Sequence, residues 1–157
     1  MKRLLLATTT LLSLATLQGA LAATTAGMGV TATVSTVCDV TAEPIDFSEI
    51  ALTGTTGSQT TVSATCTNGG TYNIGLSDGA NATGGQRRLA SGTNFLTYDL
   101  YSNTERTTHW GHAVGTDTVA GTGNGLAQSL DVFGAVTAGQ ALTTGAYTDT
   151  VQVSVTF

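Results

Sequence analysis

The sequence predicts an all-β fold, an immunoglobulin-like β-sandwich built from several short strands. Three observations support this prediction. Threonine provides 33 of the 157 residues, and Thr and Val are residues that favour strands. Glycine is abundant at 20 residues, and charged residues make up only 10% of the chain, against about 25% in an average protein. No window of the exported part of the chain has the periodicity of an amphipathic helix.

The first element is a secretory signal peptide over residues 1–22. A short basic start, Met1-Lys2-Arg3, precedes an apolar stretch over residues 4–17, and small residues at positions 20 and 22 supply a cleavage site before Ala23. A transmembrane anchor is the alternative, but the apolar stretch is shorter than the ~20 residues needed to span a membrane. Cleavage leaves 157 − 22 = 135 residues with 5 − 2 = 3 basic and 10 acidic side chains, a net charge of −7. We therefore expect an acidic, lysine-free protein exported from the cytoplasm.

The next element is a predicted strand over residues 26–35. Apolar and small polar residues alternate with a period of two, which is typical of a strand with one buried face. The apolar face consists of Ala26, Met28, Val30, Ala32 and Val34.

Four further strands are predicted between residues 60 and 132. They cover residues 60–67, 72–76, 95–101 and 126–132. Turn-rich segments at 54–58, 77–86, 91–94 and 121–125 separate them.

The last predicted strand runs to the final residue, with Tyr147, Val151, Val153, Val155 and Phe157 on one face and Asp149 interrupting it near its start. Neither terminal strand carries the Lys or Pro that usually protects an exposed sheet edge. Two interpretations remain open at this point. Both strands pair within one closed sandwich, or they join subunits by strand addition.

Two cysteines, Cys38 and Cys66, are 28 positions apart. In an exported chain they predict one disulfide, which would stabilise the fold by ~3.6 kcal/mol on the chain-entropy model. A metal site or a redox pair would need closely spaced cysteines, which the sequence lacks.

Motifs of enzymes and ligand sites are weak. The formal charge of −5 without a basic cluster argues against a nucleic-acid partner. Gly75 to Gly79 matches the G-x-S-x-G pattern of hydrolases, but no helix-forming segment follows it. His109 and His112 lack a third metal ligand and flank Trp110, which we expect in the core. The Arg87-Arg88 pair is interpreted as a solvated loop. We predict no catalytic residue, no metal site and no cofactor.

Several segments, taken in order, resemble the spore coat protein U domain family, which includes the archaic chaperone–usher pilins. They are Cys38 after a short alternating start, Ser63-Ala64-Thr65-Cys66-Thr67 leading into Tyr72-Asn73-Ile74-Gly75-Leu76, Leu96-Thr97-Tyr98-Asp99-Leu100-Tyr101, Trp110-Gly111, Val132-Phe133-Gly134, and Gly145-Ala146-Tyr147-Thr148-Asp149 running into the C-terminal strand. Together they span nearly all of the exported chain.

The resemblance implies a mechanism of assembly. Pilins of the family have an immunoglobulin-like fold that lacks its final strand and is completed by donor-strand exchange. A periplasmic chaperone first fills the resulting groove, and at an outer-membrane usher the N-terminal extension of a neighbouring subunit replaces it. On this basis Met28, Val30, Ala32 and Val34 are the donor residues. Val151, Val153, Val155 and Phe157 line the acceptor groove and contact the chaperone, and a Cys38–Cys66 disulfide ties the first strand to the second.

The resemblance therefore predicts a donor extension over residues 23–36 and a pilin domain over residues 37–157. The expected function is that of a non-enzymatic subunit of a cell-surface pilus, in a homo- or hetero-polymer that supports adhesion or biofilm formation. The alternative is a secreted monomeric sandwich that binds carbohydrate or coats the surface.

Overall fold

The computed structural model describes residues 22–51, 53–141 and 143–157. The predicted signal peptide lies outside these ranges except for its last residue, Ala22. The chain divides into two units at Thr33–Val34, and the second unit carries all the strands of the described residues.

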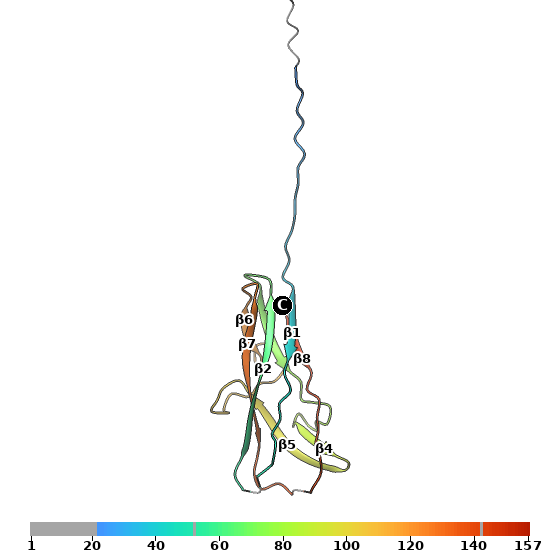
Figure 1. The fold of residues 1–157 in the computed structure, drawn as a ribbon, viewed down its shortest axis with the longest axis vertical. Helices are drawn as coiled ribbons and strands as arrows, with labels where there is room; N and C mark the ends of the chain where they lie inside the picture. Colours follow the sequence, from blue (N-terminus) through green and yellow to red (C-terminus); the bar gives the residue numbers. More distant parts are fainter. Residues whose placement is uncertain (1–21, 52, 142) are drawn as a thin grey trace, which may run out of the picture. The chain divides into compact units, whose positions relative to one another are not determined.

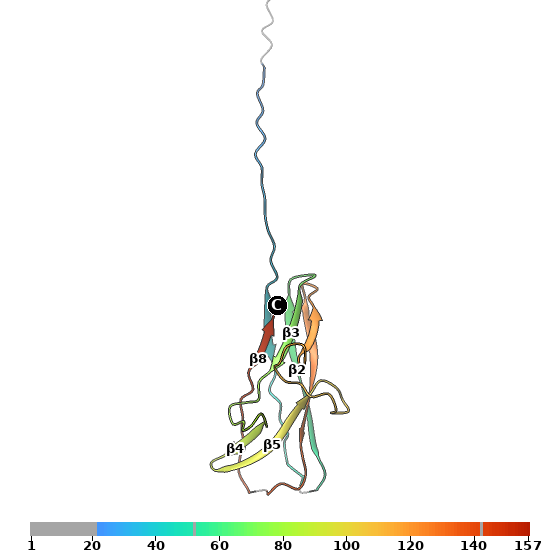
Figure 2. The same ribbon diagram turned by 180° about the vertical axis from the view of Figure 1, so that it is seen from behind.

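Eight strands form two antiparallel sheets, and the described residues contain no helix (Figures 1 and 2). The strands are β1 Cys38–Ala42, β2 Thr56–Cys66, β3 Thr71–Leu76, β4 Arg88–Ser91, β5 Asn94–Tyr101, β6 Val119–Thr122, β7 Ala127–Val136 and β8 Val153–Thr156. One sheet has the order β1-β2-β7-β5-β4 and the other the order β6-β3-β8. The predicted all-β sandwich is confirmed. Within the described ranges no helix is long and apolar enough to cross a membrane.

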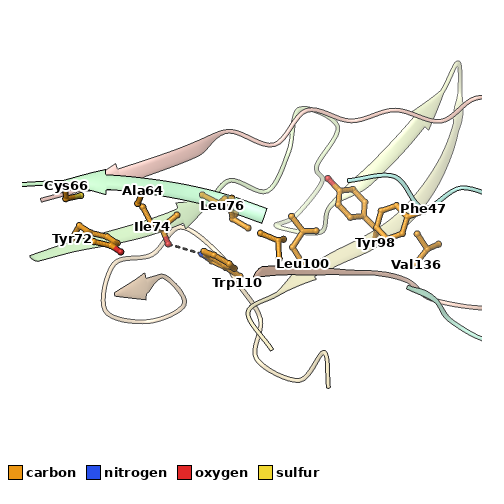
Figure 3. Packing of buried hydrophobic residues seen from close by; sticks show 12 residues of the cluster. Phe47, Ala64, Cys66, Tyr72, Ile74, Leu76, Tyr98, Leu100, Trp110 and Val136 are labelled. Atoms are coloured by element: carbon orange, nitrogen blue, oxygen red, sulfur yellow. Dashed lines mark hydrogen bonds between the residues drawn. The ribbon is translucent and has the colours of Figure 1, made fainter. Parts of the chain in front are cut away.

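The core lies between the two sheets because each strand turns alternate apolar side chains inward. In β2 these are Val62, Ala64 and Cys66, and in β3 they are Tyr72, Ile74 and Leu76, all at most 3% exposed. Figure 3 shows Leu76 next to Leu100 of the larger sheet, with Cys66 and Tyr72 at one end of the cluster and Tyr98 and Val136 at the other. Trp110 is buried as the sequence predicts, and its indole N–H donates to the Ile74 carbonyl over 2.9 Å.

The four internal strands predicted from alternation correspond to β2, β3, β5 and β7. Two of them are longer than predicted. β2 begins at Thr56 inside the predicted turn, and β7 continues from Val132 to Val136. The C-terminal strand is shorter than predicted, because only Val153–Thr156 forms a ladder with β3.

Cys38 and Cys66 form the predicted disulfide, and their Cα atoms are 4.1 Å apart. The two residues also face each other in the β1–β2 ladder, as its first register pair. The bond therefore fastens the first residue of edge strand β1 to the last residue of β2.

Candidate functional site

An apolar cleft of about 410 Å³ opens between the two sheets on the side where β1 and β8 lie. Each of these strands is the edge of its sheet, since β1 pairs only with β2 and β8 only with β3. β1 and β8 are in contact but share no ladder. The cleft lies beyond this contact: its borders are the segment that follows β1, from Ala42 to Phe47, and the segment that leads into β8, from Tyr147 to Val153. A further strand could lie between these two segments.

The floor of the cleft is the hydrophobic core itself. It consists of Val62, Leu76, Leu100 and Val132, each at most 3% exposed. Figure 3 shows Leu76 and Leu100 beside each other, with Tyr98 and Phe47 further along. The chain segment after β1, including Ile45, forms one wall.

The other wall is the C-terminal segment from Tyr147 to Val153. Val151 and Val153 are half-buried and line the cleft. Val155 packs against the core cluster, and Phe157 is 59% exposed. Of the four residues predicted for an acceptor groove, the structure thus places two on the wall of the cleft, one on the adjoining core and one at the surface.

The backbone of the C-terminal wall is hydrogen-bonded on one side. Ala90 and Thr148 exchange two bonds of 2.8 and 3.0 Å, the Ala80 N–H donates to the Thr150 carbonyl over 3.0 Å, and the Ser77 N–H donates to the Gln152 carbonyl over 2.9 Å. On the wall, the bonded residues are Thr148, Thr150 and Gln152, the even-numbered residues of an extended segment. The N–H and C=O groups of the intervening odd-numbered residues consequently face the open side, where they can pair with an added strand.

Asp149, which interrupts the apolar face, anchors this wall. Its Oδ1 accepts bonds from the Asn81 N–H and Nδ2 over 3.0 and 3.1 Å, and its Oδ2 accepts one from the Tyr98 hydroxyl over 2.7 Å. Burial, reinforced by the bond to Asp149, raises the pKa of Tyr98 well above its ordinary value, so the hydroxyl stays a donor. Gly79, at φ 89°, lies against the Asp149 carboxylate, where a Cβ would not fit.

Arg87 is a structural residue that the sequence interpretation missed. It is 1% exposed, so its interpretation as a solvated loop residue is wrong. Its guanidinium donates to the Ser77, Leu76 and Trp110 carbonyls over 2.7–2.9 Å and pairs with Asp99 over 2.8 Å. Leu76 is the last residue of β3, Ser77 follows it, and Trp110 lies in a loop. The buried guanidinium satisfies these three carbonyls where the ladder ends or is absent. The sequence gives no signal for this role beyond the scarcity of arginine.

The residues of the hydrolase-like and histidine motifs do not form a shared site. The Ser77 hydroxyl accepts a bond from the Gln152 N–H over 2.8 Å, which holds the C-terminal wall. His109 contacts Asp99 over 3.0 Å, while His112 lies 3.7 Å from Asp78. In the described part of the chain no group of three or more His, Cys, Asp or Glu residues is placed to hold a metal ion.

The N-terminal segment that carries Met28, Val30 and Ala32 forms no strand. Met28 and Val30 are 86% and 82% exposed, and Val34 at the start of the second unit is 82% exposed. The prediction of a strand with a buried face is therefore wrong for the single chain. Alternation specifies such a face, but a strand needs a neighbouring edge to pair with, and here the segment pairs with none of the described strands.

Comparisons with known proteins agree with this architecture. Residues 24–154 match the model of the Spore Coat Protein U domain family. Over 70 residues, 45% of this chain, the sequence is 39% identical to Protein U of Myxococcus xanthus. A solved structure with TM-score 0.61 and 25% identity covers 80% of this chain. It is the chaperone–tip adhesion subunit pre-assembly complex CsuC–CsuE from archaic chaperone–usher Csu pili of Acinetobacter baumannii. The matches span 38% of Protein U and 41% of the solved chain.

Proposed function

The chain belongs to the Spore Coat Protein U domain family, and we propose that it is a structural subunit of a chaperone–usher pilus, assembled by donor-strand exchange. The observation that carries the proposal is the apolar cleft between the segment that follows β1 and the segment that leads into β8. The similarity to a subunit of Csu pili supports the same role.

The cleft has the properties of an acceptor. A strand laid between the segment after β1 and the C-terminal wall would cover the floor of the cleft and pair with the free backbone groups of the C-terminal wall. Main-chain bonds along such a strand supply affinity, while alternate side chains supply specificity.

The N-terminal segment has the properties of the donor. Burying Met28, Val30 and Val34 in a neighbour's cleft would contribute roughly 1.5–3 kcal/mol each before the cost of ordering the segment. A chain that donates one strand and accepts another makes a head-to-tail contact that does not close, so the product is a filament.

The same cleft explains the proposed partners. Until the donor arrives, the half-buried apolar wall of a cleft of about 410 Å³, including Val151 and Val153, would remain accessible and favour aggregation. We propose that a periplasmic chaperone covers it and that an outer-membrane usher exchanges the chaperone for the next subunit. The similar Csu subunit was solved with its chaperone in a pre-assembly complex. A signal peptide and a disulfide suit a route through the periplasm to the cell surface, where the filament would serve adhesion or biofilm formation.

The proposed donor–acceptor pair can be tested by adding a peptide of residues 23–34 to a chain that lacks those residues. The wild-type peptide is expected to raise the Tm of the truncated chain and to bind it in calorimetry. Val30→Asp in the peptide should abolish both effects, because it puts a charge into the apolar cleft. Thr31→Asp adds the same charge to the opposite face and should leave most of the binding. If the truncated chain binds none of the three peptides and its Tm does not change, the sandwich is closed and stable alone, which is the monomeric alternative.

A further inference from the structure

The C-terminal wall of the cleft changes from one sheet to the other along its length. At the end of the wall, Val153 pairs with Leu76 in the ladder of β3 and β8. Near its start, Thr148 forms a bridge with Ala90, which belongs to β4, the edge strand of the larger sheet. The segment between these two points therefore passes from the edge of one sheet to the edge of the other, and it lines the cleft on the way.

The ladder with β3 ends at Ser77 because the carbonyl of this residue is already bound. The Ser77 N–H donates to the Gln152 carbonyl over 2.9 Å, as in a continuing ladder. The returning bond is different, because the Gln152 N–H donates to the Ser77 hydroxyl over 2.8 Å. The Ser77 carbonyl accepts instead from Nε of Arg87 over 2.9 Å. Arg87 thus diverts one backbone group, and the wall leaves β3 at this residue.

Residues 77–81, which we call the anchor loop, bind the wall from the side away from the cleft. Nδ2 of Asn81 donates to the Thr148 carbonyl and to Oδ1 of Asp149, over 3.0 and 3.1 Å. The loop binds all the even-numbered residues of the wall, which are Thr148, Thr150 and Gln152. The backbone groups of the odd-numbered residues are left for a donor strand.

The Arg87-Arg88 pair holds the anchor loop at both of its ends. Consecutive residues of an extended segment point to opposite sides, so the two side chains can reach different parts of the loop. Arg87 binds the Ser77 carbonyl, and Nε of Arg88 donates to the Asn81 carbonyl over 2.8 Å. Arg88 is half-buried, and its Cζ lies 4.1 Å from the centre of the Phe95 ring, a cation–π contact that fixes the side chain. Two of the three arginines of the exported chain therefore bind this one loop.

We propose that Arg87 and Arg88 are positioning residues for the incoming donor strand, acting through Ser77 and Asn81. Held by the anchor loop, the wall presents one register before the donor arrives. A slip by one residue would turn the apolar side chains of the wall away from the cleft. A wall that is ordered in advance also strengthens binding, because less conformational entropy is lost when the donor pairs with it. This inference rests on the proposed donor-strand exchange and adds the residues that prepare the acceptor.

The test measures binding of the wild-type peptide of residues 23–34 to the mature chain, residues 23–157, with the substitution Val30→Asp. This substitution disables the chain's own stripe as a donor and alters no residue of the cleft. Calorimetry gives the dissociation constant, denaturation in urea gives the midpoint, and NMR gives the exchange rate of the Thr148 amide.

Arg88→Met should weaken peptide binding about three- to tenfold, the effect of losing one hydrogen bond. Methionine keeps an apolar stem over Phe95 but cannot donate to the Asn81 carbonyl. The Thr148 amide should exchange faster in the free variant. It should return to the wild-type rate when the peptide is bound, because the donor then orders the wall.

The other end of the anchor loop is tested through Ser77 and Arg87. Ser77→Ala should weaken binding by a similar factor, and Ser77→Thr, which keeps the hydroxyl, should restore it. Arg87→Lys should weaken binding as well, because one ammonium cannot bind all the carbonyls that the guanidinium fork reaches. Should Arg87→Lys fail to fold, the two Ser77 variants decide for this end of the loop.

Arg106→Met is the matched control. Nε of Arg106 also donates to a backbone carbonyl, that of Gly134 over 2.9 Å, and its Cζ lies 6.0 Å from the centre of the Phe133 ring. Within the described ranges, none of its hydrogen bonds reaches the C-terminal wall. We expect this variant to lower the urea midpoint and to leave the dissociation constant unchanged.

The outcomes separate this inference from the proposed function. An unchanged dissociation constant in both Arg88→Met and Ser77→Ala would overturn the positioning role and leave donor-strand exchange standing. Equal weakening in Arg88→Met and Arg106→Met would also overturn it, because the loss of binding would then follow stability alone. An acceptor with only Val30→Asp that binds no peptide would overturn donor-strand exchange and, with it, this inference.

Discussion

At the scale of single residues, polar side chains hold the walls of the cleft in place. Asp149 connects the C-terminal wall to Tyr98 and Asn81, and Arg87 binds the carbonyls that follow β3. Both are buried or half-buried in a chain with few charges. Because apolar contacts have no fixed direction, these hydrogen bonds hold the walls of the cleft in place.

The Tyr98–Asp149 pair predicts a pH dependence of stability. The pKa of Tyr98 is raised in the folded state, so its contribution is complete below the unfolded value near 10 and is lost as the pH rises above it. The free energy of unfolding should therefore fall above about pH 10, by up to about 1.4 kcal/mol per pH unit for this one group. Denaturation in urea between pH 8 and 11 measures the slope.

Tyr98→Phe should make that slope shallower, because the titrating group is gone. The pKa of Tyr101 is also raised, by burial and by nearby Asp99, so Tyr101→Phe should remove a further part. An alkaline slope that is identical in Tyr98→Phe and the wild type would show that the hydroxyl does not contribute in this way.

At the scale of elements, the disulfide secures the strand that forms one border of the cleft. β1 is five residues long and pairs only with β2, so its ladder alone holds it weakly. Cys38→Ala with Cys66→Ala should lower the free energy of unfolding by about 3.6 kcal/mol on the chain-entropy model. Urea denaturation of the oxidised wild type and the double variant measures the difference. Equal midpoints would show that β1 is held without the bond.

Strands with one covered face were predictable from the sequence, and the remaining elements were not. β3 and β5 agree with prediction to within one residue because polar residues of their outer faces, such as Thr71, Asn73 and Thr97, stay at least partly exposed and alternation survives. β7 extends past Val132 as a continuous buried run, since Arg106 covers its outer face near Phe133. β4 and β6 are four residues long and lack a recognisable pattern.

The candidate site could be predicted in part. Alternation identified the apolar stripe from Ala26 to Val34 and the C-terminal segment, and the resemblance predicted their roles as donor and acceptor. Alternation could not show that β3 ends at Leu76, which leaves residues 147–152 without a ladder. The segment after β1 that forms the other wall has no periodicity to find. In the sequence, Asp149 could be recognised only as an interruption of the apolar alternation, because its hydrogen-bond partners Tyr98 and Asn81 are 51 and 68 residues away.

At the scale of the whole molecule, the two ends of the chain are complementary. One end supplies an exposed apolar stripe that has no edge to pair with, and the other supplies an edge and a cleft that no described strand fills. Neither feature is useful to a solitary chain, and both carry the aggregation risk of exposed apolar surface. In a polymer in which the stripe of each copy fills the cleft of the next, both apolar surfaces would be covered.

Cross-linking between the donor stripe and the cleft tests this account most directly. Copies with Val30→Cys are mixed with copies with Val151→Cys, allowed to assemble, and treated with a short bis-maleimide that spares the native disulfide. The account predicts a covalent dimer on denaturing gels, and much less of it when Thr31→Cys replaces Val30→Cys. Equal cross-linking of both pairs, or none in filaments that have formed, would contradict the claim that the stripe of one copy lies in the cleft of the next.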